Sequence, residues 1–192
     1  MALFTDKDFE ILPDFLDSPQ TEALLKEAKT LHSAGKFSAA TVGKDRTAVP
    51  DQRGDQILWW DTTGQTPAQS TFIKRLNQLR ETLNQTLFLG LHDWEGHYAH
   101  YPPGGRYEKH VDRFQKDDKR VLSTVFYLNE RWESSWGGQL RLYLPQGNTV
   151  EVAPRGGTLA LFFSDQIPHE VVKATMPRWS VAGWFRQIDT RN

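Results

Sequence analysis

Two histidines and an aspartate have the residue types and the spacing of a metal site. His110 and Asp112 are two residues apart, and residues two apart in a strand point to the same face. His169 comes later, after a Gly-rich turn and the apolar run 159–163. Two histidines and one carboxylate on one face of an iron ion leave neighbouring coordination positions open, as in the non-heme Fe(II) oxygenases. The pair His110 and Asp112 alone is weak evidence, because a surface histidine beside a solvated acid has the same pattern.

A charged residue in an otherwise apolar strand strengthens the metal-site hypothesis. Arg178 is expected to share a strand face with Ser180 and Ala182, whose small side chains leave space for a ligand. A guanidinium stays protonated at any ordinary pH, and burying it without a partner is strongly unfavourable. It binds a carboxylate through two parallel hydrogen bonds. We therefore expect an anionic ligand at Arg178.

The co-substrate 2-oxoglutarate fits both features. Its keto oxygen and adjacent carboxylate can chelate iron while its far carboxylate reaches Arg178, and dioxygen then takes the last position. Tyr127 is expected on the same side of its strand as Ser123 and Val125, so its hydroxyl could donate to the far carboxylate. The alternative for Tyr127 is a tyrosine of the core. These residues indicate an iron(II)- and 2-oxoglutarate-dependent oxygenase, in which the metal and the co-substrate supply the difficult chemistry.

From residue 96 onward the sequence is typical of antiparallel β structure. Short segments rich in β-branched and aromatic residues alternate with Gly-containing and Pro-containing turns. The expected strands are 96–102, 107–112, 120–129, 138–144, 149–153, 158–163, 168–173 and 177–187. Such a series without intervening helices favours a mainly β fold, a double-stranded β-helix or jelly roll. In the last strand, bulky apolar residues alternate with Arg178 and small residues, so one face should enter the core and the other should line the site.

Two N-terminal helices are expected to support one sheet of the jelly roll. A short strand at 11–16 precedes the first helix, for which Ser18 is the expected N-cap and Gly35 the expected end. The second helix should begin at Thr66-Pro67. The helix residues expected to be buried, from their helical spacing, are Leu24, Ala28, Leu31, Phe72, Leu76, Leu79 and Leu83.

Composition and length limit the classes of protein that need to be considered. The 192 residues, 38% of them hydrophobic, suffice for one domain, with helical support over about 1–90 and a jelly-roll core over about 91–188. The net charge of −1 gives no field that would attract nucleic acid or an anionic membrane. With no cysteine, a metal must be held by imidazole and carboxylate. The sequence has no apolar run for a signal peptide or a membrane span, so we expect a soluble, cytoplasmic protein that acts as a monomer.

A series of motifs runs in order along nearly the whole chain. The segments that carry it are 101–112, 120–129, 136–142, 161–165, 168–171 and 178–181, with Asp14-Phe-Leu, 31–37 and 53–59 upstream. The series resembles the prolyl 4-hydroxylase branch of the 2-oxoglutarate oxygenases, above all the oxygen-sensing prolyl hydroxylases of animals and their bacterial relatives. Ordered agreement of this extent is far more specific than any one motif.

The resemblance implies a role for each residue of the proposed centre. His110, Asp112 and His169 would be the catalytic iron ligands, Arg178 would bind the distal carboxylate of 2-oxoglutarate, and Tyr127 would assist Arg178. It also implies Fe(II) as cofactor and dioxygen as the second co-substrate, with ascorbate as a candidate reductant.

Further residues match positions that surround the centre in the family. Tyr101 and Tyr107 correspond to tyrosines that line the metal pocket and the substrate mouth, and Trp184 to a bulky residue of the pocket wall. Tyr101 and Trp184 are thus candidates for contact with the co-substrate, and Tyr107 for contact with the substrate.

The resemblance also locates the family's loop that closes over the peptide substrate, at roughly 39–55. Arg53 and Asp55 become candidates for contact with the substrate, or for pairing with Arg120, which is itself a candidate substrate contact. A long loop beside the site suits a lid over an extended chain.

The sequence departs from the animal enzymes at three places. The turn before His110 is one residue shorter, the segment 115–119 has a different composition, and His97 stands where those enzymes are apolar. His97 should share a strand face with Tyr101, so it is either close to the cofactor or an ordinary, partly buried histidine. These differences concern the substrate and leave the iron chemistry unaffected.

The sequence therefore predicts a dioxygenase that hydroxylates a prolyl residue in a protein or peptide, releasing succinate and carbon dioxide. One alternative is the same chemistry on a small molecule such as a free amino acid, which would need a smaller, closed pocket. Another is a jelly-roll binding module without catalysis, against which the four retained polar residues argue. A nucleic-acid demethylase is disfavoured because the sequence shows no basic groove.

Overall fold

Strands make up most of the regular structure in the computed structural model of the chain, which describes residues 3–4, 7–41, 52–61, 63–112 and 119–188. The strands are β1 (Phe9–Leu12), β2 (Ser38–Ala39), β3 (Gln56–Trp59), β4 (Leu91–Tyr101), β5 (Tyr107–His110), β6 (Arg120–Tyr127), β7 (Leu140–Tyr143), β8 (Thr149–Val152), β9 (Leu159–Phe163), β10 (His169–Val171) and β11 (Arg178–Gln187). The α-helices are α1 (Ser18–Ser33) and α2 (Pro67–Leu87), and two short 3₁₀ helices cover Ser134–Trp136 and Pro145–Gly147.

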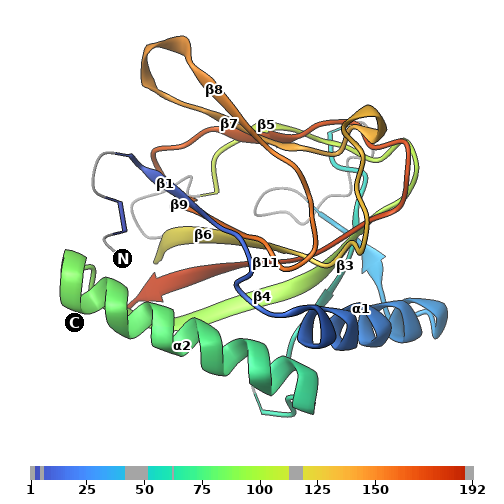
Figure 1. Cartoon of the computed structure of the whole chain (residues 1–192), viewed down its shortest axis with the longest axis horizontal. Helices are drawn as coiled ribbons and strands as arrows, with labels where there is room; N and C mark the ends of the chain where they lie inside the picture. The colour runs from blue at the N-terminus through green and yellow to red at the C-terminus, as the bar shows by residue number, and fades with distance from the viewer. Residues whose placement is uncertain (1–2, 5–6, 42–51, 62, 113–118, 189–192) are drawn as a thin grey trace.

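The strands form two antiparallel sheets that lie over one another (Figure 1). The larger sheet has the strand order β1-β9-β6-β11-β4-β3-β2, and the smaller one has the order β5-β10-β7-β8. Strands that are neighbours in the sheet are mostly distant in sequence, so the chain crosses repeatedly between the two layers. This is the predicted double-stranded β-helix with helices packed on one side.

Strand β11 lies between β4 and β6 at the centre of the larger sheet and separates the core from the cavity. Trp179, Val181 and Phe185 point to the helices, where they join the main hydrophobic core. Arg178, Ser180, Ala182 and Trp184 line the cavity between the sheets. The alternation follows from the pleat of a strand, in which successive side chains take opposite faces. The prediction for this strand is confirmed.

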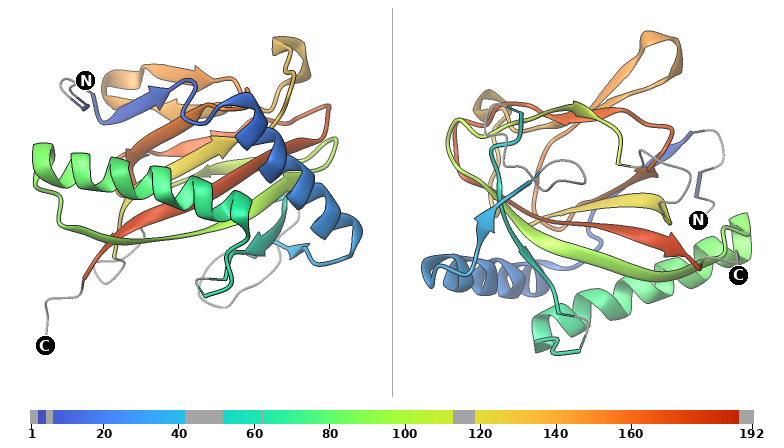
Figure 2. Two further views of the ribbon diagram at one scale, coloured as in Figure 1. Left: turned by 60° about the horizontal axis from the view of Figure 1, so that its bottom comes forward. Right: turned by 180° about the vertical axis from the view of Figure 1, so that it is seen from behind.

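The two helices cover the outer face of the larger sheet (Figure 2). Buried leucines of α1 and Phe72, Leu76, Leu79 and Leu83 of α2 pack against β4, β6, β9 and β11. Thr66 caps α2 and Pro67 is its first residue, as predicted. The prediction of Ser18 as the cap of α1 is wrong, because Asp17 caps the helix. The Asp17 side chain accepts from the backbone N–H of Gln20, and the Gln20 side chain accepts from the backbone N–H of Asp17, which is a capping box.

Several predicted boundaries need correction. The strand predicted at 11–16 is β1, which ends at Leu12 before a turn with Asp14 at positive φ. The strand predicted at 107–112 ends at His110, so Asp112 lies just beyond it. Strand β4 begins at Leu91, five positions before the predicted start at 96. The short strands β2 and β3 have no pattern strong enough to predict. Most of the predicted lid, 42–51, and the segment 113–118 lie outside the described residues.

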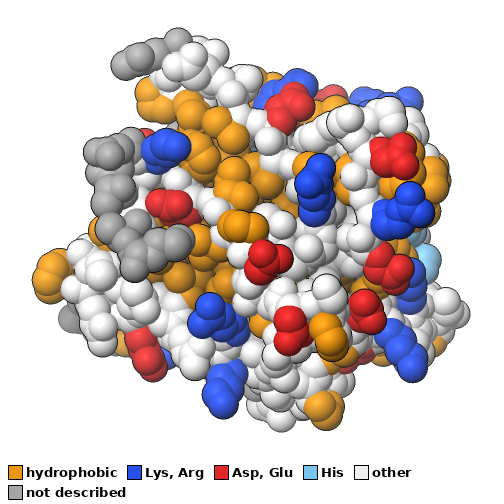
Figure 3. Space-filling view, viewed as in Figure 1, with side chains coloured by type: hydrophobic (Ala, Val, Ile, Leu, Met, Phe, Trp, Pro, Cys, Tyr) orange, Lys and Arg blue, Asp and Glu red, His pale blue; other side chains and the backbone are white. Residues whose placement is uncertain are grey.

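Acidic and basic side chains alternate over the face of the molecule seen in Figure 3. This face therefore presents no field of a single sign, as expected from a net charge of −1. In the described part of the chain, neither helix is long and apolar enough to cross a bilayer.

Candidate active site

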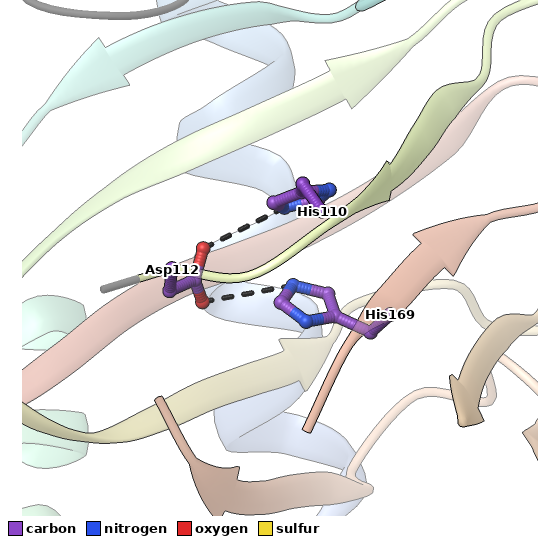
Figure 4. Close-up of side chains that lie close together, drawn as sticks. All are labelled: His110, Asp112 and His169. Atoms are coloured by element: carbon purple, nitrogen blue, oxygen red, sulfur yellow. Dashed lines mark ion pairs between the residues drawn. The ribbon is translucent and has the colours of Figure 1, made fainter. Parts of the chain in front are cut away.

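The three predicted metal ligands come together at one end of the cavity between the sheets (Figure 4). His110 ends β5 and lies directly opposite His169 of β10 in the antiparallel register. Asp112 follows two residues later, and its backbone N–H donates to the carbonyl of Ser164 over 3.2 Å. One ligand atom from each side chain lies within 4.8 Å of the others. The antiparallel pairing of β5 and β10 thus brings together residues far apart in sequence.

Hydrogen bonds to the backbone fix the orientation of both imidazoles. Nδ1 of His110 lies 2.7 Å from the carbonyl oxygen of Glu108, and Nδ1 of His169 lies 3.1 Å from that of Ile167. A carbonyl can only accept, so each Nδ1 carries the proton and each Nε2 keeps its lone pair. Each Nε2 is 3.6 Å from a different oxygen of Asp112. The ligand lone pairs therefore point to a common centre.

The protonation states also suit a cation. Burial lowers the pKa of His169 to about 4, so its ring is neutral near pH 7. Burial alone would raise the pKa of Asp112, but the neighbouring imidazoles of His169 and His110 and the hydrogen bond from Ser123 hold it well below its usual range. Neutral imidazoles and an ionised carboxylate are the forms that bind a metal. Such a donor set, without thiolates, fits Fe(II).

The other end of the cavity contains Arg178, which is 1% exposed. Its Nε donates to the carbonyl of Gly138 over 2.9 Å, and Nη1 donates to the hydroxyl of Ser180 over 3.2 Å. Gly138 has φ +72°, and a Cβ at this position would lie 2.8 Å from the ring of Trp132, so glycine lets this carbonyl approach. Nη2 is buried and has no hydrogen-bond partner in the described structure. A buried guanidinium with a free donor requires an acceptor.

Tyr127 provides a second free donor beside this guanidinium. Its ring centroid lies 5.2 Å from Cζ of Arg178, and its buried hydroxyl likewise has no partner among the described residues. Burial raises the pKa of Tyr127 to about 12, so the hydroxyl keeps its proton. The cavity thus contains three metal ligands and two unpartnered donors. The co-substrate 2-oxoglutarate matches both groups, because one of its ends chelates iron and its distal carboxylate can accept from the two donors. The residues present therefore fit both Fe(II) and this co-substrate.

Tyr101 and Trp184 both line the cavity, where the resemblance places them. Tyr101 is buried, and its ring centroid lies 5.0 Å from Cζ of Arg178. Trp184 presents a buried Nε1 without a hydrogen-bond partner in the described residues. Arg120 contacts the site through Trp184, with its Cζ 3.7 Å from the Trp184 ring, and forms an ion pair with Glu95.

The candidate substrate contacts Arg53, Asp55 and Tyr107 form a stack against a metal ligand. The Tyr107 ring stacks on that of His110, with centroids 3.6 Å apart, and Cζ of Arg53 lies 4.6 Å from the centroid of the Tyr107 ring. Arg53 donates twice to Asp55, over 2.7 and 3.0 Å. Arg53 and Asp55 are therefore paired with each other in the structure. Both remain in the cavity wall.

His97 also lines the cavity, although the sequence left its role open. It is 1% exposed, and its ring packs against Trp59 and Trp184 with centroid distances of 4.8 and 5.7 Å. Burial lowers the pKa of His97 to about 4, so the ring is neutral near pH 7. The alternation of residues in β4 correctly predicted the strand face on which His97 lies, but His97 is more deeply buried than expected.

Ser123 and Ser164 belong to the site, yet the sequence pattern did not single them out. Ser123 donates to Oδ2 of Asp112 over 2.6 Å, and the two serine hydroxyls are 2.9 Å apart. The signal available in the sequence was a polar residue on the cavity face of an apolar strand. This signal does not identify the partner of Ser123, because the contact with Ser164 depends on the pairing of β6 with β9.

Comparison with known proteins places this site in a recognised family. The model of the "2OG-Fe(II) oxygenase superfamily" matches residues 96–186, which include all three metal ligands and Arg178. The chain is 30% identical over 200 residues to prolyl hydroxylase EGLN3 of Mus musculus, covering 95% of this chain and 80% of that protein.

Some curated relatives are much longer than this chain. The hypoxia-inducible factor prolyl hydroxylase of Caenorhabditis elegans is 31% identical over 195 residues, which are 95% of this chain and 27% of that protein. The match to Egl nine homolog 1 of Mus musculus, 28% identical, covers 94% of this chain and 47% of the relative. The chain therefore spans about a quarter to a half of these two relatives.

Two solved structures are similar over nearly the whole chain. A prolyl-4-hydroxylase of Pseudomonas putida has a TM-score of 0.87 and 40% identity, and the match covers 96% of this chain and 95% of that one. A prolyl hydroxylase of Trichoplax adhaerens, in complex with a peptide fragment of the hypoxia inducible factor oxygen degradation domain, has a TM-score of 0.87 and 28% identity. That match covers 95% of this chain and 84% of the other. Both proteins share the double-stranded β-helix described above.

Proposed function

Since the chain belongs to the prolyl hydroxylases of the 2OG-Fe(II) oxygenase superfamily, we propose that it hydroxylates a prolyl residue in a protein substrate. The observation that carries this proposal is the buried Arg178, whose free Nη2 faces the cavity that also contains the His110, Asp112 and His169 cluster. A binding module without catalysis would have no use for an unpartnered buried donor next to metal ligands with open positions.

Each part of the cavity has a task in this reaction. When bound, iron(II), 2-oxoglutarate and dioxygen supply the oxidising chemistry that converts a C–H bond to C–OH, with release of succinate and carbon dioxide. His110, Asp112 and His169 would hold the metal by three side chains, a donor set that leaves positions for the co-substrates. Arg178 and the hydroxyl of Tyr127 would orient the co-substrate through its distal carboxylate.

The wall of the cavity supports a prolyl substrate. Trp59, half exposed at 49%, packs against His97 and Trp184, which line the cavity, and offers an accessible aromatic surface to a prolyl ring. The relatives are prolyl hydroxylases, and the Trichoplax adhaerens protein binds a protein-derived peptide at 28% identity to this chain. Both considerations favour a peptide over a free amino acid. We further propose that the protein acts in the cytoplasm as a monomer.

The decisive experiment compares peptide and free proline as substrates. Protein loaded with Fe(II) and 2-oxoglutarate should add one oxygen atom to prolyl residues in a cell lysate, detected by mass spectrometry, and should form succinate in proportion. Asp112→Ala protein, which lacks one metal ligand, is the matched control for non-enzymatic oxidation. Hydroxylation of free proline but of no peptide would replace this proposal by the small-molecule alternative, and absence of Fe(II) binding would favour a binding module.

A further inference from the structure

Behind the proposed metal ligand Asp112 lie two buried serines from different strands of the larger sheet. Ser123 is on β6 and is 1% exposed, while Ser164 follows β9 directly and is 0% exposed. The hydroxyl of Ser123 lies 2.6 Å from Oδ2 of Asp112 and 2.9 Å from the hydroxyl of Ser164. The three side chains thus form one hydrogen-bonded chain.

The direction of this chain follows from the number of protons. A carboxylate that binds a metal is ionised, so in the proposed site Asp112 can only accept hydrogen bonds. Ser123 has one hydroxyl proton, and the short contact to Oδ2 uses it. The proton between the serines must therefore come from Ser164. Donation runs from Ser164 to Ser123 and from Ser123 to Asp112, which strengthens the last hydrogen bond by polarising it.

The backbone closes this chain into a ring. The N–H of Asp112 donates to the carbonyl of Ser164 over 3.2 Å, and the N–H of Ser164 donates to the carbonyl of Val121 over 3.0 Å. Asp112 lies beyond the end of β5, where no ladder partner would hold it. Both its backbone and its carboxylate are consequently held by the β6 and β9 side of the cavity.

We propose that Ser123 is a positioning residue that fixes the Asp112 carboxylate for the metal, and that Ser164 acts only through Ser123. The hydrogen bond occupies Oδ2 and leaves Oδ1, which lies 3.6 Å from Nε2 of His110, as the less encumbered oxygen for the metal. Hydrogen bonds to ligating carboxylates orient them in this way in metal sites. The inference rests on the proposed metal site and adds that one buried hydroxyl determines how its only carboxylate binds.

The first test measures metal affinity and spectrum, independently of turnover. Co(II), a spectroscopic substitute for Fe(II), is titrated anaerobically into the wild type and into Ser123→Ala and Ser123→Thr variants. Ser123→Ala should bind Co(II) about 10- to 100-fold more weakly, with a changed ligand-field spectrum, as is typical when a residue behind a metal ligand is removed. Ser123→Thr keeps the hydroxyl on a residue that strands accept and should restore affinity and spectrum.

The matched control is the neighbouring residue of the same strand. Thr124 is also buried, and its hydroxyl donates to the carbonyl of Gly183 and accepts from Nε1 of Trp94, each over 3.0 Å, so it bonds to none of the metal ligands. Thr124→Val should therefore lower stability without changing Co(II) affinity. Wild-type affinity and spectrum in Ser123→Ala would overturn the inference, as would equal losses of affinity in Ser123→Ala and Thr124→Val.

A double-mutant cycle tests the role of Ser164 and remains informative if Ser123→Ala folds poorly. Ser164→Ala removes the second donor and should weaken Co(II) binding about 3- to 10-fold, on the scale of one neutral hydrogen bond. In a Ser123→Ala background, Ser164→Ala should have no further effect, because the chain is already interrupted. Additive losses, or an unaltered affinity of the single Ser164→Ala variant, would contradict the inference. A wild type that bound no Co(II) would instead overturn the proposed function.

Discussion

The two ends of the cavity differ in how far the protein satisfies its own polar groups. At the metal end, each histidine donates to a backbone carbonyl and Asp112 accepts from Ser123. At the Arg178 end, Nη2 of the guanidinium and the hydroxyl of Tyr127 are buried with no partner among the described residues.

This difference shows that, in the ligand-free protein, one end of the cavity is preorganised and the other has unsatisfied polar groups. The metal end is preorganised, so a metal ion finds its ligand atoms oriented and little free energy is lost in ordering them. The Arg178 end retains buried donors that only a ligand can satisfy, which costs stability in the empty protein and favours binding of a carboxylate. The following four changes test this contrast, beginning with the one of largest expected effect.

Replacement of Asp112 should have the largest effect, because it removes the only carboxylate of the metal cluster. Asp112→Ala is expected to abolish substrate-coupled formation of succinate and to prevent measurable Fe(II) binding. Titration with Fe(II) under anaerobic conditions and a succinate assay measure the two effects. Turnover at the wild-type rate would exclude this residue as a ligand.

Replacement of Arg178 should separate the two ends of the cavity. Arg178→Met is expected to weaken 2-oxoglutarate binding by about 3 kcal/mol, or roughly a hundredfold, on the scale of two charge-assisted hydrogen bonds. The affinity for the metal should stay unchanged, and the stability of the ligand-free variant should change by no more than about 1 kcal/mol, because one buried unpartnered donor is also removed. Calorimetry with the Mn(II)-loaded protein and denaturant unfolding measure these quantities. A loss of metal affinity as large as the loss of co-substrate affinity would contradict the separation.

His97 lies in the wall of the same cavity and should make stability depend on pH. Its pKa is about 4 in the folded protein against 6.5 for the free side chain, so the unfolded state binds the extra proton as the pH falls. This contribution to stability is complete above pH 6.5 and is lost progressively towards pH 4, and the loss amounts to about 2 kcal/mol at pH 5. Denaturant unfolding at pH 7.5 and pH 5 should show this much more loss in the wild type than in His97→Leu. Equal losses in both proteins would show that His97 does not titrate as described.

Replacement of Tyr127 should have the smallest effect. Tyr127→Phe removes a hydroxyl that has no partner in the empty cavity, so its unfolding free energy should be equal to that of the wild type or higher by about 1 kcal/mol. The KM for 2-oxoglutarate should rise about five- to tenfold, the value of one hydrogen bond. A destabilised variant would mean that the hydroxyl has a partner in the empty protein.

The parts of the fold that depend on local pattern could be predicted from the sequence. The alternation of β11 and the cap at Thr66 follow from periodicity and residue type, so both were predicted correctly. The first helix shows the limit, because Asp17 and Ser18 are both good caps and only the backbone geometry determines that Asp17 is used. Strand β2 covers only Ser38–Ala39 and depends on its pairing with β3, which no local pattern reveals.

In the candidate site, too, some residues are predictable from local pattern and others only from tertiary contacts. His110 and Asp112 were recognisable because residues two apart in the predicted strand share a face, although Asp112 lies just beyond β5, and Arg178 because a charge interrupts an apolar alternation. The contact of Ser123 with Ser164 depends on the register of β6 against β9, a pairing between residues 41 positions apart. The pairing of Asp55 with Arg53, instead of with Arg120, likewise depends on the tertiary arrangement.

Because side chains of β11 alternate strictly between the two faces, cavity positions tolerate substitution, whereas the strand does not tolerate insertion or deletion of a residue. A larger or more polar side chain at Ala182 alters the space for a guest molecule without touching Val181 or Phe185 on the opposite face. Insertion of a single residue ahead of Ser180 would do the reverse, turning Ser180, Ala182 and Trp184 towards the helices and Val181 and Phe185 into the cavity. Related chains can thus diversify what they accept by exchanging residues at even-numbered positions here, whereas insertions and deletions in this strand should be eliminated by selection.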